Sequence, residues 1–346
     1  MAENARSGGR VRKPTLEDVA RCADVSYQTV SRVINDQPSV AEATRLRVLR
    51  AIEKLDYRPN RTARSLVTRR SNAVGIVSFG ATYYGPTQML VHIETALKGR
   101  GYSLTFTTVD GGSLAAMRHA IGAFTSQNYD GVVMITPVSD FDIASVVALC
   151  GDTPFVMIDV DPGERVHSVA IAQAHGATLA AEHLIALGHR SFCEISGPLV
   201  WHDARLRHES WMTAVRAAGF TPGPSLESDW TAAGGFSATR RLLDMGVAFT
   251  ALSVGNDQMA LGAIRALRDA GLRVPEDVSV VGFDDVPEAA YFDPPLTTVR
   301  QDFEALGEQT VEYLVALIAS PTIAPHQRVL YPQFVVRSST APPRDP

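Results

Sequence analysis

The sequence predicts an α/β protein with a small helical head and a larger body built around parallel sheets. Its 346 residues, 45% of them hydrophobic, exceed one ordinary domain and predict two or three globular units. Residues 1–70 carry 15 Lys or Arg against 8 Asp or Glu, whereas the rest carry 17 against 29. A basic head on an acidic body indicates that the head meets a polyanion, although a solubilising basic tail would have the same charge.

No segment indicates export or membrane insertion. The uncharged run Ser71–Val91 is too polar to span a bilayer, and residues 1–12 lack the apolar stretch of a secretory signal. Cys22, Cys150 and Cys193 lie far apart, which excludes a disulfide framework and is typical of a reducing cytoplasm. We therefore expect a cytoplasmic protein with no contact to a membrane.

The head has the pattern of a helix-turn-helix. Thr15 precedes two acids and can cap a first helix. The periodicity breaks near Asp24, and Ser26 can cap a second helix over residues 27–35. A third helix is expected over residues 41–55, with core spacing at Val48, Ile52 and Leu55.

The second helix has two unlike faces at ~100° per residue. Its apolar face carries Thr29, Val30, Val33 and Ile34, and its polar face carries Tyr27, Gln28, Ser31, Arg32 and Asn35. Such a helix suits reading of a DNA major groove, and a plain three-helix bundle with a solvated face is the alternative.

A short basic segment, Arg58–Leu66, follows the third helix. Pro59 ends the preceding element, and the remainder can form little more than two helical turns. Such a helix is marginal alone, so it would need a partner helix and a DNA groove. Leu66 could then wedge open a base step, whereas a flexible linker is the equally simple interpretation.

The body alternates short apolar segments with helical ones, which predicts parallel sheets covered on both faces. The expected strands are Val74–Val77, Ser103–Phe106, Gly131–Ile135, Phe155–Ile158, Ser191–Ile195, Ala251–Val254 and Val278–Val281, and the first two expected helices are Gln88–Arg100 and Ser113–Gln127.

Sequence motifs for catalysis or metal binding are weak. The sequence has no GxGxxG after a strand, no GxxxxGK[ST] and no HExxH, and its histidines show no ligand pair on one helical turn. Asp284 and Asp285 follow a strand and could act as acid and base. The same acids, together with Asn256, Arg205 and Trp230, would suit binding of a sugar without turnover.

Several segments together resemble the LacI/GalR family of bacterial regulators. They are Thr15–Ala20, Val25–Asn35 and Tyr57–Asn60 in the head, and Gly197–Leu199, Ala204–Arg207, Asp229–Trp230, Asn256–Gly262, Pro294–Thr298 and Gln301–Phe303 in the body. One departure is Asp24, where many members have glycine in the turn. Asp tolerates a left-handed backbone better than most residues, so the expected cost is modest.

The resemblance implies a repressor that binds a palindromic operator as a homodimer. Tyr27, Gln28 and Arg32 would select the half-site in the major groove. Contacts that position the head would come from Leu16, Ser26, Ser31, Asn35, Thr44 and Tyr57, and the hinge helix in the minor groove would use Asn60, Ala63 and Leu66. No heptad segment follows Arg337, so we expect a dimer rather than a tetramer.

The resemblance also implies a two-lobed core like that of a periplasmic sugar-binding protein, with an effector between the lobes. Residues of the retained type in the effector site are Pro86, Asp159, Arg205, Trp230, Asn256, Asp284, Gln301 and Phe303, while Gly85 and Met89 are mild changes and Phe79, Tyr83, Ile135 and Ile171 depart from the pattern. The implied effector is a sugar or glycoside, with a galactoside as the leading candidate, and no cofactor or metal is expected. A corepressor-dependent regulator and a sugar-processing enzyme with a DNA-binding head are the alternatives.

The expected domain boundaries follow from these patterns. They are a disordered tail at 1–12, a helix-turn-helix domain at 13–58, a hinge helix and linker at 59–70, an N-terminal lobe at 71–171 and 302–329, a C-terminal lobe at 172–301 and 330–341, and a disordered tail at 342–346.

Overall fold

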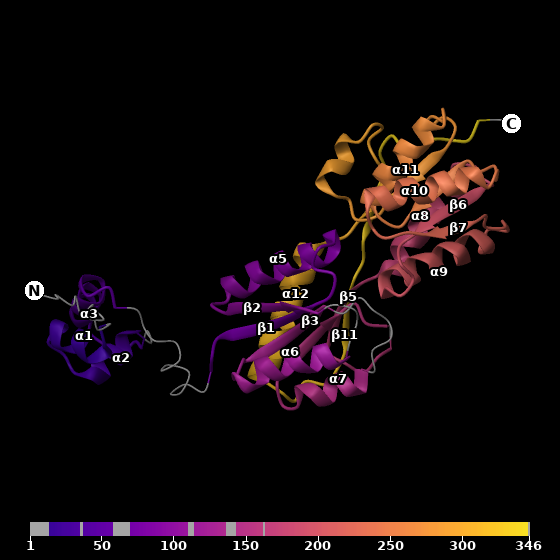
Figure 1. Cartoon of the computed structure of the whole chain (residues 1–346). Coiled ribbons are helices and arrows are strands. Elements are labelled where there is room, and N and C mark those ends of the chain that lie inside the picture. Colours follow the sequence, from indigo (N-terminus) through magenta and orange to yellow (C-terminus); the bar gives the residue numbers. More distant parts are fainter. Residues whose placement is uncertain are drawn as a thin grey trace, which may run out of the picture. The chain divides into compact units, whose positions relative to one another are not determined.

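The chain forms two compact units, residues 1–71 and residues 72–346 (Figure 1). The computed structural model describes residues 14–34, 37–57, 70–109, 114–135, 143–161 and 163–344. We call the first unit the head and the second unit the body.

The head contains three helices around a small core. They are α1 (Leu16–Ala23), α2 (Tyr27–Ile34) and α3 (Glu42–Lys54). The core gathers the apolar side of each helix and consists of Val19, Ala20, Ala23, Val30, Val33, Val48, Ala51 and Tyr57. The predicted helix-turn-helix is therefore confirmed, with α2 burying the face that its apolar periodicity indicated.

The ends of the first two helices agree with the sequence signals. Thr15 and Asp18 form a reciprocal capping box on α1, in which the Thr15 backbone N–H donates to Asp18 Oδ2 over 2.9 Å. Asp24 closes α1 in the left-handed region, at φ 51° and ψ 55°, as expected for this turn. Ser26 Oγ accepts a hydrogen bond from the Thr29 backbone N–H at the start of α2.

The N-terminal lobe of the body is a six-stranded sheet in the order β11-β5-β4-β3-β1-β2, with all neighbouring strands parallel. Its strands are β1 (Ala73–Ser78), β2 (Ser103–Thr108), β3 (Gly131–Ile135), β4 (Phe155–Ile158), β5 (Ser168–Ile171) and β11 (Gln327–Leu330). Two helices pack on each face: α5 (Tyr84–Gly99) and α12 (Phe303–Ala319) on one, α6 (Leu114–Ser126) and α7 (Ile143–Cys150) on the other.

The C-terminal lobe is built in the same way around a four-stranded parallel sheet in the order β7-β6-β8-β9. Its strands are β6 (Phe192–Ser196), β7 (Ser225–Glu227), β8 (Ala251–Val254) and β9 (Ser279–Val281). One face is covered by α8 (Gln173–Ala186) and α9 (His202–Ala217), and the other by α10 (Ala232–Asp244) and α11 (Asp257–Asp269); the short 3-10 helix η1 (Pro287–Tyr291) follows β9.

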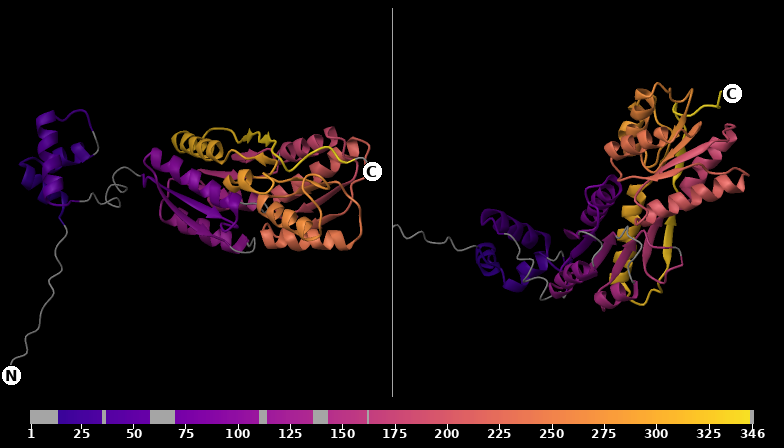
Figure 2. Two further views of the ribbon diagram at one scale, coloured as in Figure 1. Left: turned by 90° about the horizontal axis from the view of Figure 1, so that it is seen from above. Right: turned by 45° about the vertical axis from the view of Figure 1, so that its right-hand side comes forward.

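The chain passes between the two lobes three times (Figure 2). It leaves the N-terminal sheet after β5, returns after β10 (Thr298–Arg300), and leaves again after β11 to form β12 (Gln333–Val335). Strands β10 and β12 pair antiparallel, so the second and third crossing segments lie side by side. The carboxyl ends of strands from both sheets consequently border the region between the lobes, where a doubly wound fold places ligands.

The strands expected in the body are all present, and the differences are local. Helix α5 begins at Tyr84 rather than at Gln88, because Pro86 falls in its first turn, where a missing backbone N–H costs no helical hydrogen bond. Strands β5, β7, β10, β11 and β12 were not predicted; they are three or four residues long. Among the described residues, no helix is long and apolar enough to cross a membrane.

Helices α10 and α11 approach each other through two glycines. A Cβ on Gly262 would collide with the Ala232 carbonyl oxygen, and one on Gly235 would collide with the Met259 backbone. Residue 230 lies just before α10, and Asn256 is the N-cap of α11. This close packing therefore fixes the relative position of the two helix starts.

We expect Gly262→Ala to destabilise the body by about 1–3 kcal/mol, because the added methyl group forces two backbones apart. Gly122→Ala is the matched control: Gly122 also lies inside a helix, but a Cβ there meets nothing within 4 Å. The control should be neutral or stabilising by about 1 kcal/mol. Chemical denaturation of both variants measures the difference, and equal stabilities would contradict the close-packing argument.

Candidate functional site

The exposed face of α2 is the first candidate site. Tyr27 is 53% exposed, and Gln28 and Arg32 are also exposed, whereas Val30 and Val33 on the opposite face are buried. Ser26 is exposed at the start of the helix, while Leu16, Ser31 and Thr44 are half-buried. The helix therefore presents a tyrosine, an amide and a guanidinium on one accessible surface.

Tyr57, another predicted DNA contact, is only 7% exposed, and its ring belongs to the core of the head. The predicted contacts Asn35, Asn60, Ala63 and Leu66 lie outside the described residues.

The second candidate site is a narrow cavity in the body with a free volume of about 40 Å³. Side chains of both lobes line it, and the lining combines aromatic rings with polar groups: Tyr83, Tyr84, Gly85, Pro86, Met89, Trp201, Asp203, Arg207, Trp230, Asn256, Asp284 and Gln301. Sites for small molecules commonly combine aromatic and apolar walls with a few polar groups in this way.

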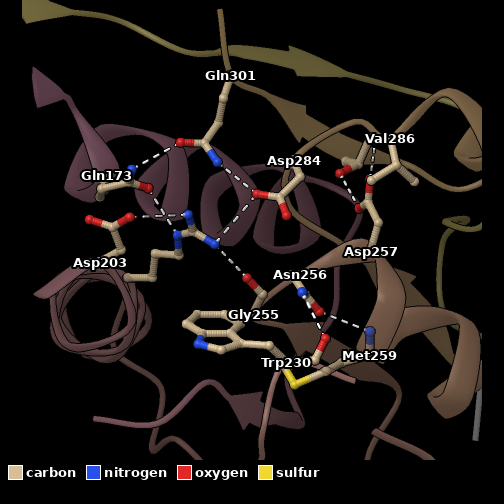
Figure 3. A network of polar contacts seen from close by, with 12 residues as sticks. Gln173, Asp203, Trp230, Gly255, Asn256, Asp257, Met259, Asp284, Val286 and Gln301 are labelled. Atoms are coloured by element: carbon tan, nitrogen blue, oxygen red, sulfur yellow. Dashed lines mark hydrogen bonds and ion pairs between the residues drawn. The ribbon is translucent and has the colours of Figure 1, made fainter. Parts of the chain in front are cut away.

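Figure 3 shows Gln173, Asp203, Gly255 and Asp284 in the polar part of this region. Arg207 lines the cavity and makes a polar contact with each of these four residues. Its Nε donates to Gln173 Oε1 over 2.9 Å, and its Nη1 donates to the Gly255 carbonyl oxygen over 2.7 Å. The guanidinium also lies 3.7 Å from Asp284 Oδ1 and 4.0 Å from Asp203 Oδ2. Its Cζ stacks 3.7 Å above the Phe283 ring, so the charge is satisfied on its edges and on one face.

A chain of amide and carboxylate groups continues from Arg207. Gln173 Nε2 donates to Gln301 Oε1 over 2.9 Å, and Gln301 Nε2 donates to Asp284 Oδ1 over 2.6 Å. Gln173 follows β5, Gln301 follows β10 and Asp284 follows β9. The network therefore joins two of the crossing segments to the carboxyl end of the C-terminal sheet.

Asn256 and Trp230 form the facing wall. Asn256 Oδ1 accepts from the Met259 backbone N–H, and its Nδ2 donates to the Trp230 carbonyl oxygen over 3.1 Å. Trp230 is 7% exposed and its ring covers Gly197, where a Cβ would collide with it. Its indole Nε1 is buried and has no hydrogen-bond partner among the described residues.

Burial raises the pKa of four carboxyl groups in and beside this cavity, those of Asp159, Asp203, Asp257 and Asp284. The pKa of Asp284 rises to about 6, mainly through desolvation, with Arg207 opposing the shift. Desolvation also raises the pKa of Asp203, and it raises that of Asp159 well above its usual range with a further contribution from the Asp203 charge. Such shifts gather at functional sites, where burial is retained for binding.

Backbone strain marks the same region. Asp159, Trp230 and Asp284 adopt positive φ angles of 57°, 71° and 112°, which side-chain-bearing residues rarely do. Strained non-glycine residues of this kind cluster at binding sites, where the surrounding packing holds them in place.

Eight of the fourteen residues named for the effector site line the cavity and six do not. Those lining it are Tyr83, Gly85, Pro86, Met89, Trp230, Asn256, Asp284 and Gln301. Ile135 and Ile171 belong to the core of the N-terminal lobe. Phe79 is 3% exposed and packs against α6 and α7, because β1 carries it to the opposite face of its sheet. Phe303 is buried against α5 and lies behind the lining, with its ring centroid 6.0 Å from that of Tyr84. Asp159 is buried outside the lining, with Oδ1 unpartnered among the described residues.

Arg205, which was predicted for the effector site, lies outside the cavity lining, whereas Arg207 belongs to it. Arg205 Nη2 lies 3.0 Å from Asp161 Oδ1, and the residue is not part of the lining. Both arginines belong to the same sequence motif on α9, but residues two apart on a helix point about 200° apart. Only one of them can therefore face the cavity.

Sequence reasoning also missed Tyr84, Trp201 and Asp203. Asp203 and Arg207 are four residues apart, hence on one face of α9, and this spacing was the signal that could have found both. Trp201 is the N-cap of the same helix and carried no signal of its own.

The arrangement is suited to binding. Asp285, the second member of the predicted acid–base pair, is held by Arg300 and Arg337 at 2.6 Å each and is absent from the lining, so the two carboxyl groups do not act on one ligand. Within the described ranges, no group of three or more His, Cys, Asp or Glu side chains could hold a metal ion.

A helix-turn-helix head joined to a two-lobed, ligand-type α/β body is the architecture of a bacterial regulatory protein. Residues 15–60 match the model for bacterial regulatory proteins of the lacI family, and residues 181–340 match a periplasmic binding protein-like domain. The chain is 36% identical to the lactose operon repressor of Escherichia coli K12 over 326 residues, 94% of this chain and 90% of that protein.

Two solved structures extend the likeness to the fold. A lac repressor dimer bound to operator and the anti-inducer ONPF superposes with a TM-score of 0.90 at 36% identity, covering 95% of this chain and 100% of that one. A complex of the transcriptional regulator CelR with cellobiose gives a TM-score of 0.71 at 34% identity, covering 94% and 99%. The protein belongs to the lacI family, and these relatives are transcriptional regulators rather than enzymes.

The raised pKa of Asp284 predicts a pH-dependent stability. Because its charged form is disfavoured in the folded state, its contribution is greatest below about pH 4 and is lost as the pH rises through about 6. The full shift corresponds to about 3 kcal/mol. Asp284→Asn, which keeps an acceptor for Gln301, should therefore raise the melting temperature at pH 8 relative to the wild type by more than it does at pH 4.5.

Asp152→Asn serves as the control, since this carboxyl group is exposed on the N-terminal lobe. It should leave the pH dependence of melting unchanged. A gain in Asp284→Asn that is equal at both pH values would show that the carboxylate is not destabilised by burial.

Proposed function

We propose that this protein is a cytoplasmic transcriptional repressor that binds a palindromic operator as a homodimer and releases it when a sugar occupies the cavity of the body. The observation that carries the proposal is the pairing of an exposed reading helix with a buried polar cavity in one chain. A galactoside is the leading candidate for the effector.

The cavity suits a pyranose. Carboxylate and amide oxygens accept bonds from sugar hydroxyls, the Arg207 guanidinium and the Trp230 indole N–H donate to them, and the indole face packs on the apolar side of the ring. The relatives support this choice, since one is named for the lactose operon and another was solved with cellobiose. Asp159 could contact the sugar only after a local movement, because it lies outside the lining of the cavity.

The head suits sequence reading. Arg32 can donate two hydrogen bonds to guanine, and Gln28 can pair with the edge of adenine. Half-buried Ser31 and Thr44 would contact the DNA phosphate backbone and so position the head on the operator. Two copies are needed to read both halves of a palindrome. Release of the operator requires the sugar to bind one lobe arrangement more tightly than the other. Otherwise sugar binding could not change how many molecules adopt the DNA-binding arrangement.

The direct test is fluorescence anisotropy with a symmetric GTGAGC–GCTCAC duplex at one stated salt concentration. We expect tight binding that is reversed by a galactoside, and sedimentation as a dimer. Binding tightened by sugar would favour a corepressor mechanism, and affinity no greater than for a random duplex would contradict the proposed half-site.

Gln28→Ala should weaken operator binding by about tenfold to a hundredfold, because the helix loses one base contact. Binding to random duplex should change little, since phosphate contacts remain. Gln37→Ala, an exposed glutamine of the head outside α2, is the matched control and should bind normally. An equal loss of operator affinity in both variants would show that Gln28 does not contact a base.

Arg207→Ala should bind the operator yet fail to release it on addition of sugar, because the guanidinium at the centre of the cavity is gone. Arg205→Ala removes the same charge from the same helix, but Arg205 pairs with Asp161 outside the lining, so this variant should release normally. Retained operator binding shows that each variant is folded. Release lost in Arg205→Ala and kept in Arg207→Ala would reverse our assignment.

A further inference from the structure

The free space in the cavity is too small for the ligand that its residues suit. Its free volume of about 40 Å³ has room for about three water molecules at roughly 10–15 Å³ each. A pyranose ring with its hydroxyl groups is several times larger. Part of the lining must therefore move before a sugar can bind.

The polar part of the lining is held in place. Arg207 and Asn256 each make two hydrogen bonds to neighbouring residues, and Gln301 donates to Asp284. Trp230 is 7% exposed and belongs to the core of the C-terminal lobe. Movement of these side chains would leave buried polar groups unpaired or open a hole in the core, and both are costly.

Trp201 is held in a different way. Its backbone begins α9, and its N–H donates to the Pro198 carbonyl oxygen, whereas its side chain is only half-buried. The preceding residue, Val200, is 59% exposed, so this end of the helix borders solvent. The indole can therefore change rotamer toward solvent without breaking the hydrogen bonds of the backbone.

The Trp201 indole rests in a seat that the other lobe provides, formed by Gly80 and Tyr83. Tyr83 meets the indole edge-to-face, with the ring centroids 5.2 Å apart. Gly80 has φ +63°, and a Cβ there would collide with Trp201 Cη2, so only glycine leaves room for the ring. Trp230 lies on the side of the cavity, with its centroid 5.9 Å from that of Trp201.

The seated indole takes up space that a ligand needs. Trp201 lines the cavity together with Tyr83 and Trp230. An indole is about as large as a pyranose ring, so its departure would supply most of the missing volume beside the polar groups. Because the seat belongs to the N-terminal lobe and the indole to the C-terminal lobe, the same movement would also remove a contact between the lobes.

Resting on the proposed function, we infer that Trp201 is an autoinhibitory gate, whose indole must leave the seat at Gly80 and Tyr83 before the effector can enter. Only the fraction of molecules with a displaced indole is competent to bind, and this fraction lowers the association rate constant and the affinity together. An ordinary contact residue acts mainly on dissociation. Occupancy of the cavity breaks the contact between the lobes, which couples the effector to the lobe arrangement.

The test is stopped-flow tryptophan fluorescence of the full-length protein, with galactose and methyl β-galactoside as probes. Trp201→Ala should raise the association rate constant about tenfold and leave the dissociation rate constant within about threefold. Tyr83→Ala removes the seat from the other lobe and should also raise the association rate constant. Tyr331→Ala, an exposed aromatic residue outside the lining, is the matched control and should change neither constant.

Faster dissociation in Trp201→Ala with an unchanged association rate constant would overturn the gate, because the residue would then only contact the bound sugar. Release of the operator by either probe would still support the proposed function in that case. Faster association in Tyr331→Ala as well would also overturn the gate, since the gain would not come from the seat.

Acrylamide quenching tests the gate without a sugar. The chain has three tryptophans, of which Trp211 is 1% exposed, so both Trp201→Ala and Trp201→Phe retain Trp211 and Trp230 as the emitting residues. If the ring at position 201 closes the cavity, quenching of Trp230 should be stronger in the Ala variant than in the Phe variant. Equal quenching would overturn the gate, even if a galactoside releases the operator. Stronger quenching in the Ala variant, with no sugar bound by the wild type, would support the gate and overturn the sugar part of the proposed function.

Discussion

The body depends on how one buried guanidinium is neutralised. The Arg207 side chain is only 9% exposed, and a charge removed from water to that extent requires paired and hydrogen-bonded neighbours. Those neighbours are Gln173, Gly255 and Asp284, with Gln301 held through Gln173. Gln173 and Gln301 lie in two of the segments that cross between the lobes. The hydrogen bonds that satisfy the Arg207 charge therefore also hold these two segments against the cavity wall.

The same network leaves the cavity prepared for a ligand at a cost in stability. Asp203 Oδ1 and Trp230 Nε1 have no partner among the described residues, and burial raises the pKa of both Asp203 and Asp284. Hydroxyl groups of a bound sugar would replace the water that these atoms have lost. The strained backbone at Trp230 and Asp284 also lowers stability, and the packing of α10 and α11 beside these residues holds it in place. Such a loss of stability is common at binding sites.

Charge and solvent exposure differ between the head, for which we propose DNA binding, and the body, for which we propose effector binding. The head combines a surplus of basic residues with an exposed tyrosine, amide and guanidinium on α2, which serves attraction to phosphates and reading of bases. The acidic body keeps its polar groups inside, where low solvent access strengthens each hydrogen bond and excludes competing water. Membership of the lacI family joins these parts in one regulator, and the proposed dimer would supply the symmetry of a palindrome.

The sequence by itself determined the head and the alternation of strands and helices, because caps and periodicity act over a few residues. Thr15, Asp24 and Ser26 are examples, since each interacts within its own turn. The resemblance of its motifs to the lacI family identified Asn256, Asp284 and Gln301 of the cavity. Only the tertiary structure decided between Arg205 and Arg207, placed Phe79 and Tyr57 in cores, and brought Trp201 to Tyr83. These outcomes depend on which side of a helix or strand meets the other lobe or the core, and that is set by packing between segments far apart in the chain.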